Sequence, residues 1–179
     1  IYINDAFGAS HRAHASIVGI PGEVKSHGVG LLMKKEVDML DKVLSKAESP
    51  YYAILGGSKV SDKIEIIESI MDQVDGFIIG GAMAYTFLAA KGIETGNSLV
   101  EQDYVTFAKN FIKRLEGRGK TLALPVDHVV VKNFSDDASL SGVTSDANIK
   151  PGKLALDIGP KTITEFSNLI ASAKFLVGA

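Results

Sequence analysis

The sequence predicts an α/β protein with a mostly parallel β-sheet and helices on both faces of that sheet. Short apolar stretches of strand length alternate with amphipathic stretches of helical length. This alternation implies βαβ units, which place helices on a parallel sheet. Two of the apolar stretches are followed directly by paired glycines, at 56–57 and 80–81. Glycine pairs at these positions suit tight turns from a strand into a helix.

The N-terminal elements precede the regular alternation. A strand is expected at residues 1–4, and a loop or short helix rich in small residues at 5–16. Residues 19–30 contain a proline and four glycines and predict a connector. A long amphipathic helix follows, and Pro50 marks its end. Its apolar positions recur at steps of four, three and four: Met33, Val37, Leu40 and Leu44.

The regular alternation begins at residue 51. Strands are expected at 51–55, 77–79, 121–131, 154–159 and 174–177, and Pro125 interrupts the third. Helices are expected at 59–74, 80–92, 101–119 and 160–173, and Pro160 suits the first turn of the last one. The polar residues 133–152 are expected to form a loop region.

Composition excludes several classes of protein. Of the 179 residues, 46% are hydrophobic and 22% are charged, as in ordinary globular proteins. The net charge is −2 and no basic stretch is present, so a nucleic-acid partner is not expected. Cysteine is absent, which excludes disulfides and fits a reducing compartment. No apolar run approaches the ~20 residues that a membrane-spanning helix needs.

Both ends of the sequence predict that it is a piece of a longer protein. It begins "IYINDAFGAS", without an initiator methionine or a basic leader. It ends on "AKFLVGA", an apolar run that predicts a strand cut short.

The first glycine pair is followed by Lys59 and Lys63. In open α/β sheets, ligands bind outside the carboxyl ends of the strands. Lysines four residues apart share one helix face, and here they would lie beside free backbone N–H groups, a combination typical of phosphate sites. The alternative is a tight turn with two solvated lysines. Neither G-x-x-x-x-G-K-[ST] nor G-x-G-x-x-G is present.

A second group of candidate residues lies in "SHRAHAS". Arg12 is flanked by small residues, which suits binding of a carboxylate or a phosphate. The alternative is a structural ion pair between Arg12 and Asp5. His11 and His14 have metal-like spacing, but no third ligand is nearby, so a metal site is not favoured.

Taken together, "NDAFGASHRAHAS", "ILGGSKVSDKI", "IIGGAMAYTFL" and "LALDIGP" resemble the phosphoglycerate kinase family in order and spacing. The resemblance covers nearly the whole chain. It implies a two-domain, monomeric, cytoplasmic kinase with a Rossmann-like sheet in each domain. Such an enzyme transfers a phosphoryl group between 1,3-bisphosphoglycerate and ADP in glycolysis, giving 3-phosphoglycerate and ATP. Mg²⁺ accompanies the nucleotide, and the resemblance assigns it no ligand in this chain.

The resemblance also implies roles for individual residues. Arg12 contacts the glycerate substrate, Lys63 contacts nucleotide phosphate, and Lys59 stabilises the transferring group. The other positions expected to line the nucleotide pocket are Gly57, Ser58, Gly81, Ala82, Ala155 and Leu156, the last two near the adenine. Three of these depart from the family's usual residues, since Ser58, Ala82 and Ala155 stand where Ala, Gly and Gly are common.

The domain organisation implied by the resemblance has three parts. Residues 1–25 end an N-terminal, glycerate-binding domain, residues 26–48 form an interdomain connector with a helix from Leu31 to Ala47, and residues 49–179 begin a C-terminal, nucleotide-binding domain. Two alternatives stay open. The 179-residue chain is itself a non-catalytic fragment with part of a nucleotide pocket, or it is a different α/β nucleotide-binding protein.

Overall fold

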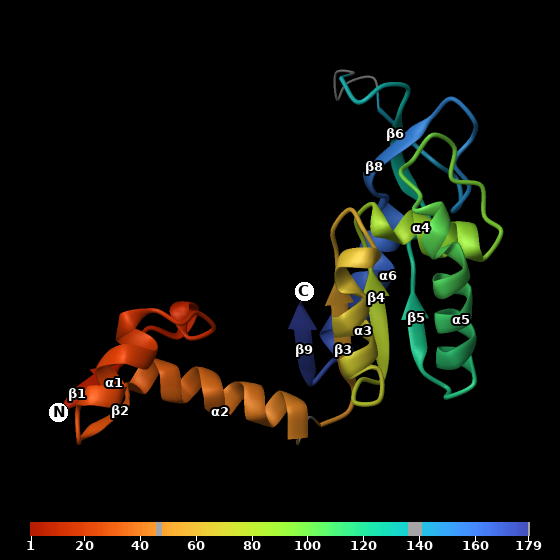
Figure 1. Ribbon diagram of the computed structural model, residues 1–179. Coiled ribbons are helices and arrows are strands. Elements are labelled where there is room, and N and C mark those ends of the chain that lie inside the picture. The colour runs from red at the N-terminus through yellow and green to blue at the C-terminus, as the bar shows by residue number, and fades with distance from the viewer. Residues whose placement is uncertain (46–47, 136–140, 179) are drawn as a thin grey trace. The chain divides into compact units, whose positions relative to one another are not determined.

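The computed structural model describes residues 1–45, 48–135 and 141–178, with the backbone alone at 43–45. Two positions of the predicted connector helix, the side chain of Leu44 and residue Ala47, therefore lie outside the described part. The chain forms two compact units, Ile1–Ala47 and Glu48–Ala179. Figure 1 shows both units and labels most of their helices and strands.

The first unit contains two short parallel strands and a long helix. Strand β1 (Tyr2–Asn4) pairs with β2 (His27–Val29), so the predicted connector contains a strand that its glycines concealed. Between them lie η1 (Phe7–Ala9), the π-helix η2 (Ala15–Gly19) and α1 (Ile20–Glu23). The long helix α2 (Leu31–Ser45) follows.

Helix α2 begins where Asp5 caps it. The backbone N–H of Met33 donates to Asp5 Oδ1 at 2.8 Å, and such a side-chain acceptor satisfies a helix-start amide that has no partner within the helix. Gly30 leaves room for this carboxylate, because a Cβ there would lie 2.3 Å from Asp5 Cγ. Met33 is buried, whereas Val37 and Leu40 remain about half exposed. The predicted apolar stripe is thus covered at its N-terminal end.

The second unit is built on a four-stranded, fully parallel sheet in the order β5-β4-β3-β9. Its strands are β3 (Tyr51–Leu55), β4 (Gly76–Ile79), β5 (Thr121–Ala123) and β9 (Phe175–Gly178). The chain runs outward from β3 through β4 to β5 and then returns to the other side of β3 as β9. The predicted parallel sheet is therefore confirmed, and its topology reverses between β3 and β9.

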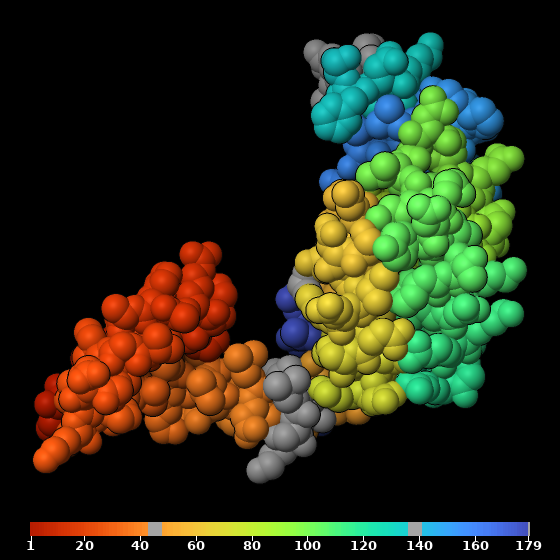
Figure 2. Space-filling model, viewed as in Figure 1, coloured from red at the N-terminus to blue at the C-terminus, as the bar shows by residue number. Residues whose placement is uncertain are grey.

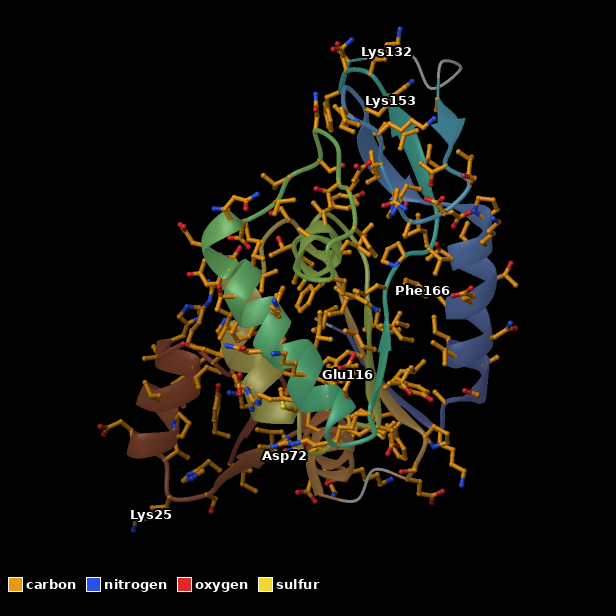
Figure 3. All side chains as sticks on the ribbon, turned by 90° about the vertical axis from the view of Figure 1, so that its right-hand side faces the viewer. Lys25, Asp72, Glu116, Lys132, Lys153 and Phe166 are labelled. Carbon is orange, nitrogen blue, oxygen red and sulfur yellow. The ribbon has the colours of Figure 1, made fainter. Side chains whose placement is uncertain are left out.

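Helices cover both faces of this sheet, as the alternation predicted. On one face Phe166 of α6 (Pro160–Ser172) packs against Tyr52 and Ile78. On the other, Phe111 of α5 (Val105–Glu116) stacks edge-on against Phe77 with ring centres 5.1 Å apart. Figure 3 shows α6, marked by Phe166, and α5, marked by Glu116, on opposite sides of the strands.

Helices α3 (Ile64–Ile70) and α5 lie side by side on the second of these faces (Figures 1 and 2). The guanidinium of Arg114 donates to both carboxylate oxygens of Glu68, at 2.6 and 2.9 Å, and Arg118 pairs with Asp72. The Nζ of Lys120 donates to the carbonyls of Met71, Asp72 and Val74, which satisfies the carboxyl end of the α3 segment. These contacts fix α3, whose N-cap residue is the candidate Lys63.

A second, antiparallel sheet was not predicted. It contains β6 (His128–Val131), β7 (Gly142–Val143) and β8 (Leu154–Ile158) in the order β7-β6-β8. The strand predicted at 121–131 is therefore two strands in two sheets, separated at Pro125, which has no N–H to donate to a ladder. The predicted strand at 154–159 pairs antiparallel with β6 instead of joining the parallel sheet. The predicted loop at 133–152 contains β7.

Candidate functional site

The two glycine turns meet at the carboxyl edge of the parallel sheet. The carbonyl of Gly57 accepts from the N–H of Met83 at 3.0 Å, and Leu55 accepts from Gly80 at 2.9 Å. A Cβ on Gly81 would lie 2.7 Å from the Gly57 oxygen and 2.8 Å from its nitrogen, and Gly81 has a φ of +64°. Only glycine fits this approach and this backbone conformation without strain. The structure thus brings together two turns that the sequence presents 24 residues apart.

This meeting point adjoins the place where the sheet topology reverses. The first turn follows β3, the strand flanked by β4 on one side and β9 on the other. In open α/β sheets, the crevice at such a reversal is the usual ligand site. Gly57, Ser58 and Lys59 are exposed there, and Ala82 is half-buried at the start of α4 (Met83–Ala90).

Lys59 and Lys63 do not lie on one helix face, so that prediction is wrong. Gly57, with a φ of +126°, directs the chain into a non-helical segment through Lys59. The helical path begins with the 3₁₀ turn η3 (Ser61–Lys63), and α3 starts only at Ile64 with Lys63 as its N-cap residue. The two lysines are therefore presented from a loop and from a helix start. Among the described residues, neither side chain forms an ion pair.

The amides beside these lysines are not all free, which corrects a second expectation. The N–H groups of Val60 and Ser61 both donate to Glu101 Oε2, and the Ser61 hydroxyl donates to Glu101 Oε1 at 2.8 Å. Glu101 thus caps η3 from about 40 residues away along the chain. Its own N–H donates to the hydroxyl of Thr86 on α4 at 3.1 Å.

The electrostatics of Glu101 favour its charged form. Partial burial works to raise its pKa, but the hydrogen bonds from Ser61 and Val60, together with the charge of Lys59, outweigh burial and hold the pKa below its ordinary value. The sequence offered no signal for this residue, because its partners are remote along the chain and "LVEQD" matches no motif. Glu101 and Thr86 are the residues of the site that the sequence interpretation missed.

Ala155 and Leu156 lie on β8 of the antiparallel sheet. Ala155 is buried, and its N–H donates to the hydroxyl of Ser98 at 3.0 Å, while Leu156 is exposed. Tyr85 connects this sheet with the second glycine turn, because it lies in the first turn of α4 and its ring packs edge-on against His128 of β6, with ring centres 5.6 Å apart. Burial and the nearby charge of Asp157 raise the pKa of Tyr85 to about 12, so this link is uncharged.

Arg12 belongs to the first unit, whereas Lys59 and Lys63 belong to the second unit, so Arg12 is considered by itself. Its side chain is exposed, and Nε lies 3.3 Å from His11 Nε2. Asp5, the partner of Arg12 in the alternative interpretation, accepts from Met33 instead, and no ion pair between Arg12 and Asp5 occurs among the described residues. The two terminal nitrogens of the guanidinium form no ion pair among the described residues and can donate to an anion.

The described residues contain no group of three or more histidine or carboxylate side chains that would hold a metal ion. Glu101, the carboxylate next to Lys59, already accepts three hydrogen bonds. Nor do the described helices include one that is long and apolar enough to cross a membrane.

The fold and the turns together define an open α/β protein with a glycine-lined, cationic edge next to the topological reversal of its sheet. A family model described as phosphoglycerate kinase matches residues 1–178. A phosphoglycerate kinase of Bdellovibrio bacteriovorus is 55% identical over 97% of this chain, and one of Clostridium botulinum (strain Langeland) is 49% identical over 99% of it. The chain therefore belongs to the phosphoglycerate kinase family.

Solved structures agree with this assignment. The phosphoglycerate kinase of Coxiella burnetii aligns with 98% of this chain at a TM-score of 0.88 and 36% identity. The enzyme of Pyrococcus horikoshii OT3 aligns with 98% of it at a TM-score of 0.77 and 27% identity. The chain spans 43–44% of the length of the two curated relatives and 44–45% of these two solved chains.

Proposed function

We propose that this chain is the central portion of a glycolytic phosphoglycerate kinase, which transfers a phosphoryl group reversibly between 1,3-bisphosphoglycerate and ADP. One observation of the second unit carries the proposal. Lys59 and Lys63 bring two positive charges, without a described ion-pair partner, to the merged glycine turns at the sheet edge. Phosphoryl transfer needs positioning and charge neutralisation more than covalent help, and such an edge supplies both.

Within this proposal the two lysines have different tasks. Lys63 lies at the start of α3 and meets a phosphate that is already charged in the ground state. Lys59 lies on the exposed loop after β3 and stabilises the charge that develops on the transferring group. The pocket walls are the turn residues Gly57, Ser58, Gly81 and Ala82, with Ala155 and Leu156 beside the adenine.

Within the same proposal, Arg12 binds the glycerate substrate. Its exposed guanidinium in a turn of small residues suits a carboxylate or a phosphate, because its planar fork donates two parallel hydrogen bonds. It would act as a substrate ligand with a catalytic role.

Mg²⁺ is the metal that the family implies, and the described residues do not offer it a ligand set. Mg²⁺ commonly binds through nucleotide phosphates and water with few protein ligands. We therefore propose that it arrives with the nucleotide, and we assign it no ligand in this chain. We further propose a cytoplasmic monomer whose ligands are small molecules, with no nucleic-acid or membrane partner.

The second candidate function is that of a non-catalytic fragment that keeps part of the nucleotide pocket. It is favoured by the share of the relatives that this chain spans, which is below one half. The two candidates are separated by assaying 3-phosphoglycerate-dependent ATP consumption for the 179-residue chain and for the full-length protein. We expect turnover from the full-length protein and none from the chain alone. A full-length protein that binds ADP without phosphorylating 3-phosphoglycerate would contradict the kinase proposal.

A further inference from the structure

Glu101 makes three hydrogen bonds to two consecutive residues of the lysine loop. Its carboxylate receives the N–H groups of Val60 and Ser61 and the hydroxyl of Ser61. Consecutive backbone N–H groups that converge on one point form an anion site. In this protein a side chain of the chain itself fills that site. A phosphate at this edge must therefore be met mainly by Lys59, Lys63 and the turn amides that precede residue 60.

The same residue is tied to the second glycine turn. The Glu101 N–H donates to the hydroxyl of Thr86, which is 1% exposed on α4, five residues after Gly81. Buried helix residues of this kind have well-defined rotamers, so Thr86 is a rigid anchor. Glu101 thus joins the segment that carries Lys59 to the helix that opens behind Gly81, in addition to the bond between Met83 and Gly57.

The charge of Glu101 also acts on Lys59. The charge of Lys59 contributes to lowering the pKa of Glu101, although the two groups form no direct ion pair among the described residues. The hydrogen bonds from Val60 and Ser61 to Glu101 hold the backbone next to Lys59, and the Lys59 ammonium has no described ion-pair partner, so its donors are available for an anion.

We propose that Glu101 is a positioning residue for phosphoryl transfer, which holds the Lys59 loop against α4 so that the Lys59 ammonium is presented to the transferring group. This inference rests on the kinase function proposed above. Since Glu101 acts through Lys59 and not on the nucleotide itself, its loss should affect the rate more than nucleotide affinity.

The test uses the full-length protein with three substitutions. Glu101→Ala removes both carboxylate oxygens and with them all three hydrogen bonds, and Glu101→Gln keeps one acceptor oxygen but loses the charge. Asp103→Asn is the matched control, because Asp103 is an exposed carboxylate two residues away, in the 3₁₀ turn η4 (Gln102–Tyr104). We expect kcat to fall about tenfold in Glu101→Gln and further in Glu101→Ala, with the ADP Kd changed by less than about threefold. The control should behave as wild type.

A double-mutant cycle shows whether Glu101 acts through Lys59. In the Lys59→Ala background, Glu101→Gln should lower kcat by less than about twofold, because the group that it positions is gone. An undiminished effect of Glu101→Gln in that background would overturn the inference, and so would an unchanged kcat in the presence of Lys59.

Amide hydrogen exchange provides a readout that is independent of turnover. In Glu101→Gln the amides of Val60 and Ser61 should exchange at least about tenfold faster, while the amides of β3 and β4 keep their protection. Unchanged exchange at residues 60 and 61 would overturn this inference but would not contradict the proposed kinase function. A wild-type protein without turnover would instead contradict the proposed kinase function. Fast exchange in the variant would then still show that Glu101 holds the Lys59 loop.

Discussion

Two helical segments of the second unit start at carboxylates from distant parts of the chain, yet they leave different groups available. At the start of α6, Asp127 accepts from the N–H groups of Lys161 and Thr162 and from the Thr162 hydroxyl, at 2.6–3.0 Å. At the start of η3, Glu101 accepts in the same way from Val60 and Ser61. The difference lies in burial and in the neighbouring lysines.

Asp127 is fully buried, and Gly159 is needed beside it because a Cβ there would lie 2.3 Å from its Cγ. The nearby Lys161 uses its ammonium to donate to the Ser145 carbonyl at 2.7 Å. The groups around this helix start are thus satisfied within the protein. At η3, by contrast, Lys59 and Lys63 have no described ion-pair partner. A carboxylate cap thus stabilises the fold at the start of α6. At the start of η3 a similar cap leaves the ammonium groups of Lys59 and Lys63 available for a ligand.

The largest effect is expected for Lys59→Ala in the full-length protein. If Lys59 meets charge that develops in the transition state, kcat should fall by about 10²–10³, as for other lost transition-state donors, with little change in the ADP Kd. Single-turnover kinetics with ITC of ADP measures both quantities, and Lys109→Ala on the exposed side of α5 is the matched control. A raised Kd with an intact single-turnover rate would make Lys59 a binding residue only.

Asp127→Asn should affect stability and not chemistry. The new amide group turns a donor toward the N–H groups of residues 161 and 162, so hydrogen bonds of this buried helix cap are lost. The free energy of unfolding of the protein should therefore fall by about 1–3 kcal/mol. Urea denaturation of the full-length protein measures the loss, with Asp103→Asn as the exposed control. If kcat of the folded variant fell and its stability did not, the contrast between the two caps would be wrong.

Lys63→Ala should weaken nucleotide binding by about tenfold, because one charge-assisted contact to a ground-state phosphate is lost. The effect is smaller than that of Lys59→Ala and appears in the Kd instead of kcat. ITC with ADP tests it, and circular dichroism confirms that the variant folds. Equal affinities for the variant and the wild type would favour the alternative of solvated lysines at this turn.

The smallest effect is the pH dependence of stability that Asp127 contributes. Burial works to raise its pKa, but hydrogen bonds from Thr162 and Lys161 outweigh burial and lower the pKa below its ordinary value of about 4. A lowered carboxylate pKa stabilises the fold fully above the unfolded value, and the contribution is lost as pH falls through the folded value. Unfolding followed from about pH 6 to about pH 3 should therefore show a shallower acid slope in Asp127→Asn. An unchanged slope would mean that another carboxylate dominates.

Local patterns predicted the parallel sheet and the glycine turns, because strand periods, helix periods and paired glycines can be recognised within short stretches of sequence. They did not predict the path after Gly57. The helix predicted from Lys59 did not take into account the positive φ of Gly57. Nor did it take into account Glu101, which caps the helical path after Lys59 from about 40 residues away along the chain. The antiparallel pairing of β6 with β8 and the link through Tyr85 also depend on such remote contacts. The role of Arg12 stays a prediction, since it lies in the other unit.

The most direct test is a crystal structure of the full-length protein with ADP and Mg²⁺. The proposal predicts that the phosphates lie at the carboxyl edge of β3, within hydrogen-bond reach of Lys63 and the turn at Gly57. It also predicts that Glu101 still accepts from Val60 and Ser61. A nucleotide bound away from this edge, or phosphates that displace Glu101 from those amides, would contradict it.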